Sequence, residues 1–170
     1  MRIQDIQYLF EYNYWARDRI LDQAAFLSPQ QLIEPRTYSQ GSLRNTLVHI
    51  LSAEWVWRVR CQERISPASL LKFEDFPTLE LLCQRWSQEE ALMRNYLQGL
   101  TDLELDGVVK YQRTGGESQE NILWQLLVHI VNHGTEHRSV VAEGLTAHGF
   151  SPGNLDIIHF VRARTDQPKL

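Results

Sequence analysis

Apolar residues recur at helical spacing along four long stretches of this chain, and this pattern constrains the fold more than any other feature. In the first stretch Ile6, Leu9 and Phe10 share one face, and in the second Leu43, Leu47 and Ile50 do so. The four expected helices cover residues 3–27, 42–63, 78–100, and from 118 or 121 to 148. The chain has 170 residues, which matches a single domain over residues 1–170, since domains commonly have roughly 100–200 residues. The sequence therefore predicts an all-α fold, with a four-helix bundle as the natural architecture.

Shorter elements are expected between the long helices. Ser28 and Gln31 have the spacing of a helix N-terminal capping box, and Pro29 fits the first helical position. Thr101 with its acidic partner three residues later forms a second such pattern. Residues 108–116 break the helical period and end in two glycines, which predicts a small hairpin before the fourth long helix.

Charge and cysteine content exclude several classes of protein. The formal net charge is −4, so the chain lacks the basic surface typical of nucleic-acid binding. The two cysteines, Cys61 and Cys83, form no C-x-x-C pair, which argues against a disulfide scaffold and against a cysteine-based zinc site.

The chain also lacks the patterns of a membrane protein. Its most apolar stretch, residues 122–131, is too short to span a bilayer. Asp5 and Glu11 interrupt the region where a signal peptide needs an apolar core. We therefore expect a cytoplasmic protein that does not associate with a membrane.

Histidines at a spacing of four carry the main chemical signal. His129, His133 and His137 lie in the segment LVHIVNHGTEH of the fourth expected helix. Residues i and i+4 project from the same side of a helix, about 6 Å apart along its axis, so two imidazoles can bind one metal ion. His129 and His137 are separated by about 12 Å of rise, which prevents all three from sharing an ion. One adjacent pair is therefore expected to bind, with a third ligand from another helix, and His49 is the candidate.

A structural role for these histidines is the competing interpretation, because helical histidines are often core or partly exposed polar residues. The pattern also differs from the H-E-x-x-H motif of metalloproteases, since Glu136 immediately precedes His137. The general base of a metalloprotease is absent from its place, so a protease is disfavoured.

Three further residues are candidates for substrate binding. Trp15 and Trp55 fit the wall of a pocket beside the metal, although core packing is the alternative for both. Arg138 follows the last histidine, where its guanidinium could orient an anionic group of a substrate. A surface ion pair or a contact with a helix C-terminus is the alternative for Arg138.

Several segments of the chain resemble the DinB-like (YfiT-like) superfamily of metal-dependent bacterial helical bundles. The resemblance spans nearly the whole chain, and its most specific part is the last motif, an H-x-x-x-H-R pattern late in the fourth expected helix. The matching segments are YNYWA at residues 12–16, SL at 42–43, LVHI at 47–50, AEW at 53–55, HIVNH at 129–133 and EHR at 136–138.

The resemblance implies a bundle of up-down-down-up topology with a divalent metal held by His49, His133 and His137, and it makes His129 a neighbour of the site. Zinc and nickel both suit imidazole ligands. Characterised branches of the superfamily include bacillithiol S-transferases and a mycothiol-dependent maleylpyruvate isomerase. The isomerase type resembles this chain less, since it has a glutamate at the position of His133.

The leading functional hypothesis is a metal-dependent enzyme for a small molecule, either a thiol S-transferase with a low-molecular-weight thiol as co-substrate or a hydrolase. The alternatives are a non-catalytic metal-binding bundle that acts in stress response through a protein partner, and a structural helical dimer. A homodimer through the first and third long helices is expected, since two-fold dimers are the commonest oligomers.

Overall fold

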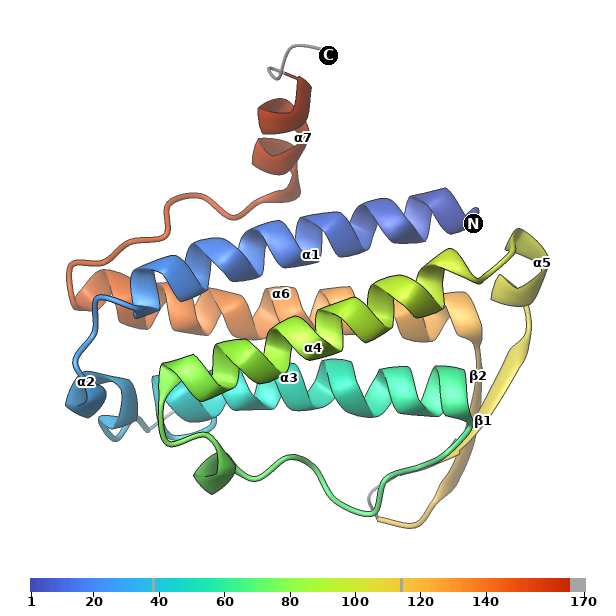
Figure 1. Ribbon diagram of the computed structural model, residues 1–170, viewed down its shortest axis with the longest axis horizontal. Coiled ribbons are helices and arrows are strands. Elements are labelled where there is room, and N and C mark those ends of the chain that lie inside the picture. The colour runs from blue at the N-terminus through green and yellow to red at the C-terminus, as the bar shows by residue number, and fades with distance from the viewer. Residues whose placement is uncertain (38, 114, 166–170) are drawn as a thin grey trace.

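Four long helices account for most of the fold (Figure 1). The computed structural model describes residues 1–37, 39–113 and 115–165. α1 and α6 run in one direction, and α3 and α4 run in the other. Each helix packs against two of the others, in the cyclic order α1, α6, α3 and α4. Their bounds are α1 Ile3–Ala24, α3 Leu43–Arg58, α4 Leu79–Gln98 and α6 Leu123–Ala147.

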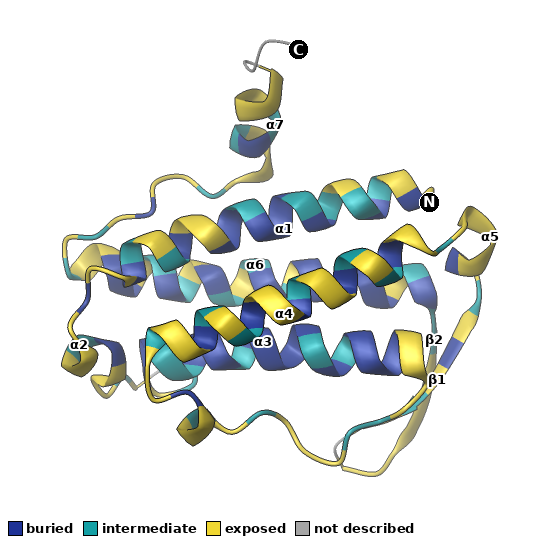
Figure 2. Cartoon of the chain, viewed as in Figure 1, coloured by how far each residue is buried: buried dark blue, intermediate teal, exposed yellow. Residues whose placement is uncertain are grey.

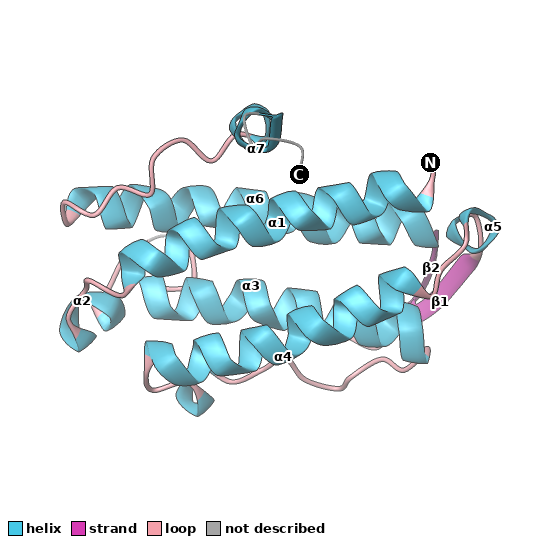
Figure 3. Ribbon diagram, turned by 45° about the horizontal axis from the view of Figure 1, so that its top comes forward, coloured by secondary structure: helices cyan, strands magenta, loops and turns pink. Residues whose placement is uncertain are grey.

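The long helices bury one face each and expose the other (Figure 2). Their buried apolar residues form two core clusters, one that includes Ile6 and Leu127 and one that includes Ile20 and Leu47. Figure 3 shows α1 and α6 in one layer and α3 and α4 in the other. The prediction of a mainly helical chain is confirmed.

Short elements cap and connect the long helices. In α2 (Pro29–Ile33), the Ser28 hydroxyl accepts a hydrogen bond from the Gln31 amide N–H, and the Gln31 side chain accepts one from the Ser28 amide N–H. This is the capping box expected there. The second capping box begins α5 (Asp102–Leu105), where the Thr101 side chain accepts a bond from the Glu104 amide N–H. A 3₁₀ turn, η2 (Phe73–Asp75), precedes α4, and α7 (Ile157–Thr165) packs Phe160 against α1.

A two-stranded antiparallel sheet joins α5 to α6. β1 (Val108–Gln112) pairs with β2 (Ser118–Ile122), and Gly116 adopts a positive φ of 86° in the turn. The expected hairpin is therefore present, but residues 118–122 are strand rather than the start of the fourth long helix. Their amides and carbonyls pair with β1, and the helix begins only at Leu123.

The C-terminal end of α3 changes its winding before it stops. The helix continues as a π-helix, η1 (Val59–Glu63), and ends at Arg64 in the left-handed conformation with φ 60°. The expected helix over residues 42–63 is thus continuous in the chain but contains a wider last turn. Such wide turns occur often at functional sites.

Candidate metal site

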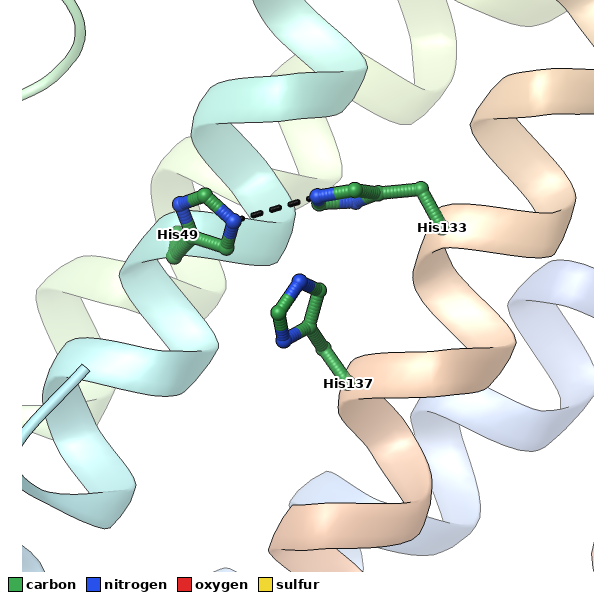
Figure 4. A group of neighbouring side chains, drawn as sticks. All are labelled: His49, His133 and His137. Carbon is green, nitrogen blue, oxygen red and sulfur yellow. Dashed lines mark hydrogen bonds between the residues drawn. The ribbon is translucent and has the colours of Figure 1, made fainter. Parts of the chain in front are cut away.

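Three histidine side chains converge between α3 and α6 (Figure 4). His49 projects from α3, and His133 and His137 project from successive turns of α6. The Nε2 atoms of His133 and His49 are 3.1 Å apart. One ring nitrogen from each of the three residues lies within 4.8 Å of the others. The i, i+4 spacing predicts that one adjacent pair of histidines meets a third histidine from another helix. In the structure that pair is His133 and His137, which lie beside His49.

The three imidazoles are half-buried and favour their neutral form. Burial, followed by the charges of His137 and His49, lowers the pKa of His133 to about 3. Burial also lowers the pKa of His49 and of His137. Neutral imidazole is the form that binds metal ions, because one of its ring nitrogens carries a free lone pair.

Geometry and donor chemistry both fit a divalent transition metal. Two ligands of one tetrahedral ion with metal–nitrogen bonds of about 2.0–2.1 Å lie about 3.3 Å apart, close to the separation of the His133 and His49 nitrogens. The buried Nδ1 atom of His137 has no hydrogen-bond partner within the described residues. A buried nitrogen without a partner is costly, and a bound ion or water molecule is one explanation for such a group. Three imidazoles fit zinc or nickel better than magnesium or calcium, which prefer oxygen.

His129 lies beside the cluster and outside it. Its ring centroid is 5.9 Å from that of His133, and its side chain is exposed. The ring meets Trp57 edge-on, with centroids 5.2 Å apart. This position is the one that the family resemblance implies for it.

Arg138 lies within a buried hydrogen-bond network behind the histidines. Only 2% of its surface is exposed. Its Nη1 donates to Asn13 Oδ1 at 2.5 Å, and its Nη2 donates to Thr135 Oγ1 at 3.0 Å. Asn13 Nδ2 in turn donates to Glu54 Oε1 at 2.8 Å. The expected contact of Arg138 with an anionic substrate stays a prediction, and the contacts of the arginine are with α1 and α6.

The same network connects all four long helices. The indole N–H of Trp86, on α4, donates to Glu54 Oε2 at 2.7 Å. Burial raises the pKa of the Glu54 carboxyl, and the bonds from Asn13 and Trp86 oppose that shift. Burial lowers the pKa of Arg138, and the charge of Glu54 raises it. The donors and acceptors of the network are thus paired with one another, as a buried polar cluster requires.

Gly134 allows this network to approach α6 between His133 and His137. A Cβ atom at this position would lie 2.6 Å from Arg138 Nη1 and 2.9 Å from Asn13 Oδ1. Both contacts are too short for carbon against nitrogen or oxygen. The absence of a side chain at Gly134 therefore permits the Asn13–Arg138 bond on the turn that joins His133 to His137.

The two tryptophans predicted to bind substrate, Trp15 and Trp55, lie on different helices. Trp15 is half-buried on α1 and packs against Phe160 of α7. Trp55 is half-buried on α3, one residue after Glu54. The tryptophan that contacts a neighbour of the histidine cluster is Trp57, which the sequence interpretation did not select. Only the way in which α3 lies against α6 brings Trp57 to His129, so no local motif identifies it.

The fold and the cluster define a helical protein with a three-histidine site of the kind that binds a divalent metal. The model of the DinB family matches residues 3–169, and the chain belongs to this family. A search of curated proteins finds no match to the chain. Within the described residues no helix is both long enough and apolar enough to cross a membrane.

Proposed function

We propose that this protein is a metal-dependent enzyme for a small molecule, with zinc or nickel held by His49, His133 and His137. The observation that supports this most directly is the convergence of three imidazole nitrogens within 4.8 Å of one another. Membership of the DinB family agrees with it. We also propose that the four long helices form the up-down-down-up bundle of that family.

The reaction that we propose is transfer of a low-molecular-weight thiol to an electrophile, or hydrolysis of a small substrate. A divalent ion at this site would lower the pKa of a thiol or water molecule that it binds. The three imidazoles are neutral ligands, so they leave the positive charge of an ion undiminished. Each histidine is half-buried rather than fully buried, so the cluster is not sealed from solvent.

Metal analysis of the purified protein tests the site. We expect about one zinc or nickel ion per chain in protein purified without chelator. His49→Ala, His133→Ala and His137→Ala should each lose most of this metal, and His129→Ala should keep it. Protein that cannot be loaded with either metal would contradict the proposal.

Activity separates an enzyme from a metal-binding protein that acts through a partner. Metal-loaded protein is incubated with a panel of low-molecular-weight thiols and 1-chloro-2,4-dinitrobenzene, and separately with small esters and amides. Turnover that disappears in folded, metal-free His137→Ala supports the enzyme. Full metal occupancy without turnover in either assay favours the non-catalytic stress-response protein.

We further propose that the protein is a cytoplasmic homodimer whose interface includes α1 and α4. Leu81 and Leu92 on α4 are large apolar residues with 44% and 47% of their surface exposed. Burying such residues is favourable. Sedimentation equilibrium should give twice the chain mass, and a mass near 19.9 kDa at all concentrations would contradict the dimer.

A further inference from the structure

We propose that Trp57, His129 and Tyr111 form a subsite beside the histidine cluster that binds a flat, conjugated group with a negative charge. The inference rests on the proposed function, since it makes this row of rings the part of the site that selects the substrate. It assigns a substrate class, the aromatic or conjugated carboxylates, to a surface defined by these three side chains.

The three rings continue outward from the histidine cluster without a gap. From His133 the next ring is His129, at a centroid distance of 5.9 Å. Trp57 follows at 5.2 Å from His129, and Tyr111 at 5.0 Å from Trp57. Each step is within the range in which aromatic rings contact one another. The row therefore leads from the candidate metal ligands on α6, across the end of α3, to β1.

The rings are accessible as well as contiguous. His129 is exposed, and Trp57 and Tyr111 are half-buried. Trp57 meets both of its neighbours nearly at right angles, at 76° to Tyr111 and 79° to His129. Edge-to-face packing of this kind is favourable for aromatic pairs, so it holds the three rings in place.

A buried cation behind the row determines the charge of the ligand. The Arg60 guanidinium carbon is 4.7 Å from the centroid of Trp57 and 5.2 Å from that of Tyr111. Only 6% of Arg60 is exposed, and its Nε has no partner among the described residues. Its Nη2 donates to the carbonyl of Gln112 at 2.9 Å.

No carboxylate of the described residues forms an ion pair with Arg60, in contrast to Arg58, which pairs with Glu63 and Glu89. Burial lowers the pKa of the Arg60 guanidinium, and the neighbouring Tyr111 and Cys61 side chains oppose that shift. A cation without a carboxylate partner attracts an anion held near it, and the rings of Trp57 and Tyr111, which its guanidinium contacts, are partly exposed. The combination of aromatic faces and uncompensated charge favours a conjugated acid over a neutral or aliphatic ligand.

The subsite lies on well-fixed elements, so it is prepared before a ligand arrives. Trp57 is in the last regular turn of α3, and Arg60 is in the π-helix η1 that follows it. Tyr111 belongs to β1, and its hydroxyl donates to Asn121 of β2 at 2.9 Å. A preformed site loses little conformational entropy on binding.

Binding of 2-naphthoate to the full chain tests the proposal, with 2-naphthamide as the uncharged probe and cyclohexanecarboxylate as the aliphatic acid. Affinity is measured by calorimetry for metal-free and zinc-treated protein, and the contacts are mapped by NMR on the ring signals of His129. We expect 2-naphthoate to bind more tightly than either other probe and to shift the His129 signals. Trp57→Leu should weaken 2-naphthoate binding at least about tenfold, and Trp57→Phe should recover part of the loss.

Two variants serve as controls and separate ring from charge. Phe26→Leu removes an aromatic ring that lies outside the row, against Phe150, and should change the affinity by less than about twofold. Arg60→Gln should abolish the preference for 2-naphthoate over 2-naphthamide. Circular dichroism confirms that each variant is folded.

The outcomes distinguish this inference from the proposed function. Unchanged binding of 2-naphthoate by folded Trp57→Leu, absent binding by the natural chain, or NMR shifts confined to residues away from His129 would overturn the subsite, whatever the metal content. Trp57-dependent binding by a protein that takes up no metal would leave the subsite in place and overturn the proposed metal-dependent enzyme.

Discussion

The network around Glu54 and the histidine cluster share neighbouring turns of α6, but they differ in how their polar atoms are paired. Asn13, Glu54, Trp86 and Arg138 donate and accept among themselves while almost fully buried. The histidines are half-buried. His49 and His133 form a hydrogen bond with each other, and His137 Nδ1 has no partner within the described residues. Groups that satisfy one another stabilise the fold, whereas groups held together without partners are available to a ligand. Substitutions in the first region should therefore change stability, and those in the second should change metal affinity.

The largest effect is expected from Glu54→Ala. The substitution leaves the Asn13 and Trp86 N–H groups without acceptors and removes the carboxylate whose charge raises the pKa of the buried Arg138. The free energy of unfolding of the metal-free protein should fall by about 3–5 kcal/mol, as measured by urea denaturation. Glu136→Ala, at an exposed position of α6, is the control and should change it by less than about 0.5 kcal/mol. A Glu54→Ala protein as stable as the natural chain would contradict the conclusion that the network around Glu54 stabilises the fold.

His133→Ala should show the opposite pattern. Zinc affinity should fall more than about 100-fold, because loss of a direct ligand exceeds the 10–100-fold effect of losing a group that only supports one. Stability without metal should change little, since His49 is the one hydrogen-bond partner of this ring among the described residues. Competition with a zinc-binding dye measures the affinity. His129→Ala should stay within about threefold of the natural chain, and a larger loss there would place His129 among the ligands.

Gly134→Ala connects the two regions and should affect both by a smaller amount. The new methyl group would contact Arg138 and Asn13 at distances that force their side chains to shift. The strain of about 1–3 kcal/mol is offset in part by about 1 kcal/mol from the better helix propensity of alanine. We expect a net loss of about 1 kcal/mol and a measurable decrease in zinc affinity. Ser139→Ala, at an exposed position of the same helix, should change neither quantity.

The smallest effect is expected from Thr135→Val. The Thr135 hydroxyl accepts a bond from Arg138 and donates to the Val131 carbonyl, and its loss should cost about 1 kcal/mol of stability. Thr146→Val is a matched control, because that hydroxyl also donates to a carbonyl four residues earlier on α6 but meets no arginine. Zinc affinity should remain within about twofold for both variants. A large loss of affinity in Thr135→Val would show that the network also supports the metal site.

The sequence predicts the two regions to different extents. The spacing of His133 and His137 places them on one face of one helix, and the helical pattern around His49 places it on another, so the cluster could be expected. Arg138 projects about 100° away from His137, and only the packing of α1 against α6 places it beside Asn13. The strand at residues 118–122 could not be predicted, because its exposed, polar residues lack an alternating pattern and it is defined by pairing with β1. Local periodicity therefore predicts where helices form, but it does not predict which residues of different helices come into contact.

The separation of the histidines along the chain has a consequence for how the protein is made. His49 and His133 are 84 residues apart, and the chain between them includes all of α4 and the β1–β2 hairpin. A ribosome that has released only the first half of the chain has therefore produced a single histidine of the cluster. Since the other two arrive on α6, a metal ion that needs three imidazoles cannot guide the early steps of folding and can bind only after synthesis has passed residue 137.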